Sequence, residues 1–499
     1  METLRGGDKV ARSMRPNLLQ LYIAPGDGSM SSRLSAALVG ALVDGQLDDG
    51  DDLPSSRVFA HDLGISRSVV VAAYQELIAS GFFVSKSGGS TRVELGARNA
   101  ALAGALSSSL HPTDQRTSLP DEPSGPVLRF DLLPGYPDTS LINRTDWSRA
   151  IRTSAGGIED FRPYFGTSDP ELGSRHNCFP ELQSILADHI RRRRGFLADP
   201  EDIYIFTSVN ASLKVLLPVL VESNNSIAIE DPGYVTARNA ITGAGFNVRS
   251  IGVDEGGMMV SHLRGSDAAV YVTPAHQFPM GSRMSVDRRA QLLEWAEREG
   301  SLVFEDDYDG EFRYGVPPMP ALRGMGSGSQ SVVYLGTASK VLARDLRIAW
   351  AVVPKKYRSK VRQRVAEEGD SVSPIAAKVL SSFIRSEALT RHIVSAHHTY
   401  AARRQRFAEA CRELLPEMKL EGIDAGLHVV LSSEKLFDDV TVVKQLQQRG
   451  LACMPLSGYY LDKSVRIRNG LVCGYSRLPE TQALHAVKTL RDVLDRNGV

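Results

Sequence analysis

The residues with the clearest chemical potential are a lysine and a run of acids on two separate segments. Lys340 lies in GTASK (336–340), directly after the apolar stretch VVYLG (332–336). A lysine on a rigid element can form a Schiff base with an aldehyde. Asp306 lies in FEDDYDGEF (304–312), at the end of another apolar stretch. A buried carboxylate there could keep a pyridine nitrogen protonated, which makes the ring an electron sink. This pair is typical of a pyridoxal 5'-phosphate (PLP) site.

Other side chains near these segments could bind the ring and the phosphate of such a cofactor. If the strand stays extended, Asp306 and Tyr308 point to the same side, so Tyr308 could donate to the phenolic oxygen. The same alternation favours Asp306 over Asp307 as the partner of the ring nitrogen. Tyr234, in EDPGY after another apolar stretch, could stack on a flat ring. The phosphate could be bound by Thr337, Ser339 and Arg347.

Each of these features also has a purely structural explanation. A Ser-Lys pair is common at an exposed helix start, and acids are common in solvated loops at strand ends. Those explanations account for Lys340 or for one acid, but poorly for the whole set. His276 and Gln277, in TPAHQFPMG (273–281), could make polar contacts, although a lone histidine is more often structural.

A second, unrelated signature lies near the N-terminus, in LPSSRVFAHDLGISRSVVVAAYQELIASGF (53–82). One helix begins behind Ser55 or Ser56 and ends at Gly64, and the next begins behind Ser66. The strand-like stretches 82–84 and 91–95 then enclose a glycine-rich tip. The pattern predicts a helix-turn-helix with a wing, which places the N-terminus of its second helix in the major groove of DNA.

Several side chains occupy positions where such a domain contacts DNA. Basic groups would meet phosphates or guanine edges there, although solvated surface charges are the alternative explanation. The first ninety or so residues hold at least as many acids as bases, so affinity would depend on a few contacts. The predicted DNA-binding residues are Arg57, Ser66, Arg67, Ser68, Lys86 and Arg92.

Composition sets the broad class of the protein. The 499 residues are too many for one core, and a formal net charge of zero gives no global attraction to nucleic acid or membrane. No apolar stretch is long enough to span a bilayer or to act as a secretion signal, so we expect a cytoplasmic protein. The four cysteines lack paired spacing, and we expect neither a metal site nor disulfides: Cys178, Cys411, Cys453 and Cys473.

Patterning along the chain predicts two domains of different type. After a helix at about 31–44, the DNA-binding domain covers 25–95, and an Ala, Ser, Pro and Gly-rich stretch at 96–127 predicts a flexible linker. The rest, 128–499, predicts an α/β domain with a small C-terminal subdomain from about 375 to 499. Its apolar strands alternate with helices, which predicts a parallel or mixed sheet covered on both faces: 203–206, 226–230, 268–273, 301–306 and 332–336.

Together these residues resemble the MocR-type regulators, in which a GntR-like winged helix is fused to an aminotransferase-like domain of fold type I. The most specific matches are VYVTPAHQFPMG, FEDDYDGEFRY and YLGTASKVLARDLRIAW, and the resemblance runs from about Ser31 to the C-terminus. It implies a Schiff base of PLP with Lys340, and the ring and phosphate ligands named above. It also implies a head-to-tail homodimer that binds double-stranded operator DNA.

Some positions depart from the family pattern. Val209 begins the segment that replaces a Gly-Ala-Gln-type phosphate turn. We expect Asn210 and Ala211 to contact the cofactor there, in an altered backbone cradle, because valine disfavours positive φ. Phe165 lacks the hydroxyl that would reach the neighbouring subunit's phosphate. Val472, in GLVCGYS (470–476), takes the place of the arginine that clamps a substrate carboxylate. The arginines nearby are Arg466, Arg468 and Arg477.

The sequence therefore predicts a DNA-binding transcriptional regulator that binds PLP at Lys340 and senses PLP or a small amine. A working aminotransferase is the main alternative, and the missing arginine counts against it. A third hypothesis is a regulator that has lost the cofactor and uses the second domain only to dimerise. The fold does not separate these three hypotheses, because one scaffold can host each of them.

Overall fold

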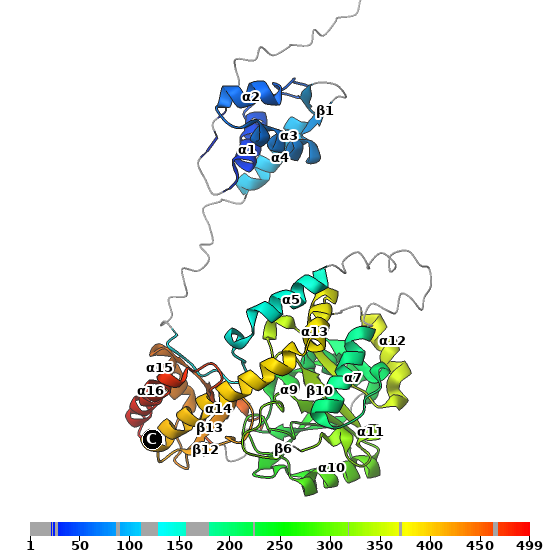
Figure 1. The fold of residues 1–499 in the computed structure, drawn as a ribbon, viewed down its shortest axis with the longest axis vertical. Coiled ribbons are helices and arrows are strands. Elements are labelled where there is room, and N and C mark those ends of the chain that lie inside the picture. The colour runs from blue at the N-terminus through cyan, green and yellow to red at the C-terminus, as the bar shows by residue number, and fades with distance from the viewer. Residues whose placement is uncertain are drawn as a thin grey trace, which may run out of the picture. The chain divides into compact units, whose positions relative to one another are not determined.

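The chain forms two compact units, Met1–Ser124 and Gly125–Val499 (Figure 1). Within the described residues, no helix has both the length and the apolar character that crossing a bilayer requires. The computed structural model describes residues 21, 23–24, 28–85, 90–110, 128–155, 179–222, 225–317, 319–368, 372–462 and 468–499.

The first unit contains a winged helix. Three helices, α1 (Met30–Val43), α2 (Ser56–Leu63) and α3 (Arg67–Ala79), pack around a core of leucine, alanine and aromatic side chains. Strands β1 (Phe83–Ser85) and β2 (Thr91–Val93) form an antiparallel hairpin behind them. The order of elements agrees with the predicted helix, helix-turn-helix and wing.

Local sequence sets the boundaries of α2. Ser55 caps the helix, because its hydroxyl accepts a hydrogen bond from the backbone N–H of Val58 at 3.4 Å. Gly64 ends it in the left-handed conformation, at φ 65°, which suits a residue without a β-carbon. The turn that follows positions the start of α3.

The first half of the predicted linker is not a flexible segment in the structure but a helix, α4 (Ala97–Leu110). Ala97 and Ala101 are each only 4% exposed and belong to the core of the first unit. Alanines four residues apart form a narrow apolar stripe, which lets a helix pack closely against its neighbours. A helix with so small an apolar face is not recognised from the spacing of large apolar residues. The part of the predicted linker at 111–127 lies outside the described residues.

The second unit is built on an eight-stranded mixed sheet with the order β4-β11-β10-β9-β8-β5-β6-β7. Each of the five predicted strands is present, with its ends within one residue of the prediction. The strands are β4 (Ile203–Phe206), β5 (Ser226–Asp231), β6 (Asn247–Asp254), β7 (Gly257–Met258), β8 (Asp267–Val272), β9 (Leu302–Asp307), β10 (Val332–Thr337) and β11 (Ala349–Val352).

Helices cover both faces of this sheet, as Figure 1 shows. One face is covered by α8 (Val209–Leu220), α9 (Val235–Gly243) and α12 (Arg358–Glu368). The helices that contribute to the cores of the other face are α5 (Arg144–Ala155), α7 (Pro180–Arg194), α10 (Val286–Glu299) and α13 (Pro374–Arg385). A short helix, α11 (Gly328–Ser331), precedes β10.

A smaller subdomain has its own antiparallel sheet, in the order β12-β13-β16-β15. Its core contains Phe130, Leu132, Phe312 and Tyr314 from earlier segments and then continues from Ala396 on a long helix. Because α13 packs against the large sheet, the C-terminal part of the subdomain starts later in the chain than the predicted 375. Its elements are α14 (Ala388–Leu414), β12 (Lys419–Glu421), β13 (His428–Ser432), α15 (Asp439–Gln448), β15 (Met454–Pro455), β16 (Gly470–Gly474) and α16 (Ala483–Arg496).

Two features of the topology direct polar residues to one edge of the large sheet. Strands β5, β8, β9 and β10 run parallel, so their carboxyl ends share an edge, which is where open α/β sheets bind ligands. In addition, β3 (Phe130–Asp131) pairs with β14 (Leu451–Ala452). The chain then continues from β3 to Gly135, whose carbonyl oxygen accepts a hydrogen bond from Lys340.

Candidate functional site

Lys340 lies just beyond the end of β10. Its Nζ donates a hydrogen bond to the carbonyl oxygen of Gly135 at 2.7 Å and lies 5.9 Å from the centre of the Tyr136 ring. Gly135 has φ 76°, and a β-carbon there would lie 2.8 Å from Nζ, so this contact requires glycine. Burial lowers the pKa of Lys340, and the Arg344 cation lowers it further, while nearby carboxylates oppose both. A depressed pKa favours the neutral amine, which is the nucleophilic form.

Asp306 and Asp307 end strand β9 and make different contacts. Asp306 accepts a hydrogen bond from the Tyr271 hydroxyl on β8, and its second oxygen is buried without a hydrogen-bond partner among the described residues. Burial raises the pKa of Asp306 to about 7, and the charge of Lys340 acts in the opposite direction. Asp307 instead accepts from Tyr334 at 2.9 Å. Asp306 is therefore the acid whose charge interacts with the lysine.

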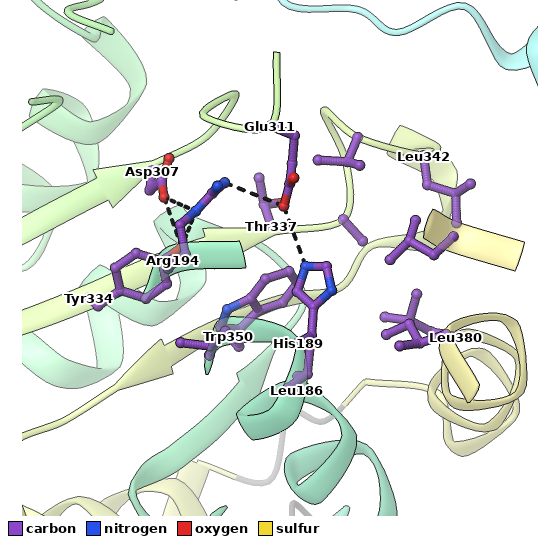
Figure 2. Close-up of a pocket in the computed structure, with 15 residues that line it drawn as sticks. Leu186, His189, Arg194, Asp307, Glu311, Tyr334, Thr337, Leu342, Trp350 and Leu380 are labelled. Carbon is purple, nitrogen blue, oxygen red and sulfur yellow. Dashed lines mark hydrogen bonds and ion pairs between the residues drawn. The ribbon is translucent and has the colours of Figure 1, made fainter. Parts of the chain in front are cut away.

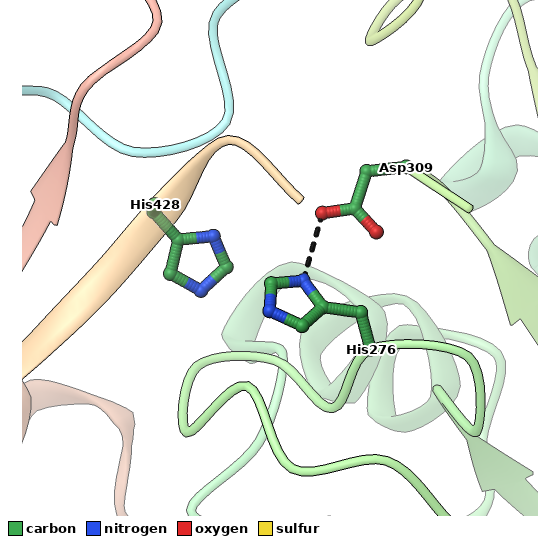
Figure 3. A group of neighbouring side chains, drawn as sticks. All are labelled: His276, Asp309 and His428. Carbon is green, nitrogen blue, oxygen red and sulfur yellow. Dashed lines mark hydrogen bonds and ion pairs between the residues drawn. The ribbon is translucent and has the colours of Figure 1, made fainter. Parts of the chain in front are cut away.

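Tyr308 is held by a buried polar group, drawn in part in Figure 3. Its hydroxyl lies 3.1 Å from Nδ1 of His276, and the same nitrogen lies 2.9 Å from Asp309. The ring centre of His428 lies 5.0 Å from that of His276. The ligand-type atoms of His276, Asp309 and His428 lie within 4.8 Å of one another, and the hydrogen bond accounts for the closeness of the first two. His276 thus supports Tyr308.

Tyr234 lies at the start of α9, directly after the carboxyl end of β5. Its ring is half-buried and packs edge-on against Phe278, with 5.6 Å between the ring centres. Burial raises the pKa of Tyr234, and the charges of Asp306 and Arg344 also act on it. The tyrosine is therefore close to the same polar residues as Lys340.

The predicted phosphate ligands at and after the end of β10 differ in accessibility: Thr337 is buried, Ser339 is half-buried and Arg347 is exposed. The Thr337 hydroxyl accepts a hydrogen bond from the N–H of Ser339 at 3.1 Å and lies 3.4 Å from the carbonyl oxygen of Ile348. Arg347 is exposed, and its backbone has φ 49°. This left-handed conformation is costly for a residue other than glycine, and such strain gathers at functional sites.

The N-terminus of α8 differs from the expected phosphate turn. Ser208 caps the helix by accepting a hydrogen bond from the N–H of Ala211 at 3.1 Å, so that N–H group is already engaged, contrary to our expectation. Val209 is helical, so a valine is tolerated there without positive φ. The side-chain oxygen of Asn210 is buried and has no hydrogen-bond partner within the described part of the chain.

The opposite face of β9 and β10 carries a buried ion cluster, shown in Figure 2. Arg194 on α7 pairs with Asp307 and lies 3.5 Å from Glu311, which in turn lies 3.4 Å from His189. Burial opposes ionisation of Glu311, but the Arg194 cation together with His189 and Arg193 outweighs it, so the pKa of Glu311 lies well below its usual range. Nothing in the sequence marks this cluster, because RRRR (191–194) has the composition of a solvated helix end.

The arginines considered as replacements for a carboxylate clamp have different environments. Val472, on β16, is fully buried in an apolar cluster that includes Leu456. Arg468 pairs with Glu421 at 2.6 Å. Arg477 lies with its guanidinium carbon 4.6 Å from the centre of the Tyr136 ring. The other two residues singled out in the sequence, Phe165 and Arg466, lie outside the described residues.

Four of the predicted DNA contacts are exposed, and the structure differs from expectation at two positions. Ser66, Arg67 and Ser68 lie at the start of α3, but the Ser66 hydroxyl contacts that of Ser68 at 3.0 Å instead of capping the helix. Arg57 is exposed on α2. Arg92 is already engaged, because its Nη2 donates to Asp52 at 2.9 Å. The sixth predicted contact, Lys86, lies outside the described residues.

Comparison with known proteins agrees with both parts of this architecture. The gntR family of bacterial regulatory proteins matches residues 30–93, and the aminotransferase class I and II family matches residues 171–471. Among solved structures, an archaeal alanine:glyoxylate aminotransferase aligns with a TM-score of 0.67 and 24% identity over 74% of this chain and 92% of its own. That likeness establishes the fold of the second unit.

The fold and the matched families define a class of protein in which a GntR-type helix-turn-helix precedes a fold type I aminotransferase-like domain. The pyridoxine biosynthesis regulator PdxR of Corynebacterium glutamicum is 30% identical over 93% of this chain and 94% of its own. The probable rhizopine catabolism regulatory protein MocR of Rhizobium meliloti is 28% identical over 93% and 94%. The chain belongs to this family of HTH-type transcriptional regulators.

Proposed function

We propose that the second unit binds PLP at Lys340, and that occupation of this pocket by the cofactor or by a small amine changes how the winged helix binds its operator. The observation that carries the proposal is the convergence of Lys340 and Asp306 at the carboxyl ends of adjacent parallel strands. The unpartnered oxygen of Asp306 supports it, because a protonated ring nitrogen would satisfy that oxygen.

The residues fit the cofactor in their chemistry. When bound, PLP supplies an aldehyde for a primary amine and a ring that withdraws electrons. Lys340 would hold the aldehyde carbon, Asp306 the ring nitrogen, Tyr308 the phenolic oxygen and Tyr234 a face of the ring. The phosphate would be held by Thr337, Ser339, Arg347 and Asn210, with the N-terminal dipole of α8 favouring its negative charge.

The regulatory step needs two DNA-binding units whose spacing can change. The family relationship supports a head-to-tail homodimer on two operator half-sites. A ligand that binds one dimer geometry more tightly than another would shift the population toward that geometry. Transamination is the weaker function, because the buried Val472 cannot clamp a substrate carboxylate.

Two titrations of the full-length protein test this function. PLP is added to the wild type, to Lys340→Ala and to the control Lys214→Ala, whose lysine is exposed on α8. A visible absorption band is expected in the wild type and the control and is lost in Lys340→Ala. An operator is then selected from a random duplex library, and its binding is followed by fluorescence anisotropy with and without PLP and small amines. Isotherms that coincide under all conditions would refute the sensing function.

A further inference from the structure

Tyr136 is surrounded by positive charge next to Lys340. The guanidinium carbon of Arg477 lies 4.6 Å from the centre of its ring, that of Arg344 lies 5.1 Å away, and Nζ of Lys340 lies 5.9 Å away. Arg344 also donates a hydrogen bond to the Tyr136 hydroxyl. These cations come from the end of β16 and from the segment after β10, so the fold brings them together on one aromatic ring.

The loop that carries Tyr136 is fastened at both ends. Before it, the carbonyl oxygen of Leu132 accepts a hydrogen bond from the N–H of Gly474 at 2.7 Å. After it, the N–H of Asp138 donates to the Tyr400 hydroxyl at 2.8 Å, and Arg403 donates to the Asp138 carboxylate at 2.7 Å. The ring and the cations around it are therefore positioned before any ligand arrives.

The two guanidinium charges beside the ring are not fully matched by ion-paired carboxylates among the described residues. Arg477 pairs with Asp131 at 2.5 Å, yet its Nε is buried without a hydrogen-bond partner among the residues that the structure describes. Arg344 is exposed and, within that same part of the chain, has no carboxylate at ion-pair distance. One carboxylate thus faces two guanidinium groups beside the lysine. An incoming anion would restore the balance.

We propose that Arg344 and Arg477 form an anion subsite beside Lys340 that selects amines bearing a carboxylate or sulfonate, which are amino acids in the broad sense. The inference deepens the proposed function, on which its amine end rests. The planar forks of the two arginines suit a carboxylate or sulfonate, and the Tyr136 ring, which both arginines and Lys340 approach, provides a flat wall of the subsite. The subsite would take over the task that the buried Val472 cannot perform.

The test compares ligands that differ only in the acidic group. Isothermal calorimetry of the full-length protein measures n-propylamine against 3-aminopropanoate and n-pentylamine against 5-aminopentanoate, with and without PLP. We expect the acid of one or both pairs to bind at least about 10-fold more tightly, the size of a charge-assisted hydrogen bond. Arg344→Gln and Arg477→Gln should each bring that ratio toward one. Arg344→Lys keeps the positive charge but lacks the planar guanidinium group, so this variant should retain part of the affinity ratio.

Controls separate this inference from a folding defect and from the proposed function. Arg412→Gln removes an exposed arginine near the end of α14 and should leave the ratio unchanged, and thermal unfolding verifies that each variant folds. Equal affinities within both wild-type pairs, or ratios that survive both glutamine variants, would overturn the subsite. The subsite would also be overturned if Arg344→Gln bound PLP more weakly while the affinity ratio of acid to amine stayed unchanged. That result would make Arg344 a phosphate ligand. If PLP gives no Lys340-dependent band, the cofactor proposal fails, and the ratio in cofactor-free protein still decides the subsite.

Discussion

Asp306 and Asp307 are neighbours on β9, yet their carboxylates serve opposite faces of the sheet. Asp306 accepts from Tyr271 and interacts electrostatically with Lys340, whereas Asp307 accepts from Tyr334 and pairs with Arg194. Successive side chains of a strand point to opposite faces, so adjacent positions can carry unrelated tasks. The pair therefore gives a direct way to separate ligand binding from stability.

Asp306→Asn is expected to weaken PLP binding while preserving the fold. A neutral amide cannot stabilise a protonated ring nitrogen, and losing one buried charged hydrogen bond corresponds to about 1.5–3 kcal/mol of binding free energy. Asp307→Asn is the matched control. Asp307→Asn leaves Arg194 poorly paired and should lower the free energy of unfolding by about 3–5 kcal/mol, with little direct effect on PLP affinity. Spectral titration measures PLP affinity, and urea unfolding measures stability. Equal loss of PLP affinity in both variants would contradict the assignment of Asp306 to ligand binding and Asp307 to stability.

The stability of the cofactor-free protein should fall as pH rises from about 5 to about 8. Burial raises the pKa of Asp306 to about 7, whereas an unfolded aspartate titrates near 3.9. The folded state therefore keeps a proton that the unfolded state has released. This stabilisation is complete at pH values below the pKa of Asp306 in the unfolded chain. It is lost as the pH rises through the pKa of Asp306 in the folded protein. Glu230 and Glu305, each with a pKa raised to about 7, act in the same direction.

Asp306→Asn isolates the share of this pH dependence that belongs to one carboxyl group. Relative to the variant, the wild type should lose about 2.5 kcal/mol between pH 5 and pH 8, because part of the linked loss has already occurred below pH 5. Urea unfolding of the second unit at both ends of the range gives the comparison. Parallel losses in wild type and variant would show that Asp306 titrates normally.

Operator binding should depend more on Arg67 than on Arg92. Arg67 is exposed at the N-terminus of α3, the part of a recognition helix that meets base edges. Its replacement by alanine should weaken binding by about 1–3 kcal/mol. Arg92 is already paired with Asp52, so Arg92→Ala should have the smaller effect. Anisotropy titrations at two salt concentrations test the order, and a reversed order would mean that the Asp52 pair opens on DNA.

The helix α4 should contribute to the stability of the first unit. Ala101 is buried in its core, so Ala101→Asp places a charge there and should destabilise the unit by about 3 kcal/mol or more. Asn99→Asp makes the same type of change at an exposed position of the helix and should have little effect. Thermal unfolding of the full-length protein measures both variants. Unfolding midpoints that do not differ would show that α4 is dispensable.

Repetitive patterns were predictable from the sequence. The strands of the large sheet are continuous apolar runs, and the helices of the winged helix begin and end at serine and glycine, so local rules suffice for both. The preference for Asp306 over Asp307 followed from strand alternation, and in the structure the charge of Lys340 acts on Asp306.

Features that depend on contacts between distant segments were not predictable. Tyr136 lies far from Arg344 and Arg477 in the chain, and no local pattern marks it as their common partner. The packing of α4 depends on small side chains whose burial only the tertiary structure reveals. In the same way, the Ser208 cap engages an N–H group that the sequence left open for phosphate.

The two networks on β9 have separate hydrogen-bond and ion-pair partners among the described residues, which bears on how such a protein can change over generations. If the proposed site binds its ligand, substitutions around Tyr136 and Tyr234 would change ligand preference, while Arg194 and Glu311 pair on the other side of the sheet. Effects at sites without common partners tend to add. A laboratory selection for new inducers could therefore explore one side of the sheet freely, without an accompanying search for compensating mutations.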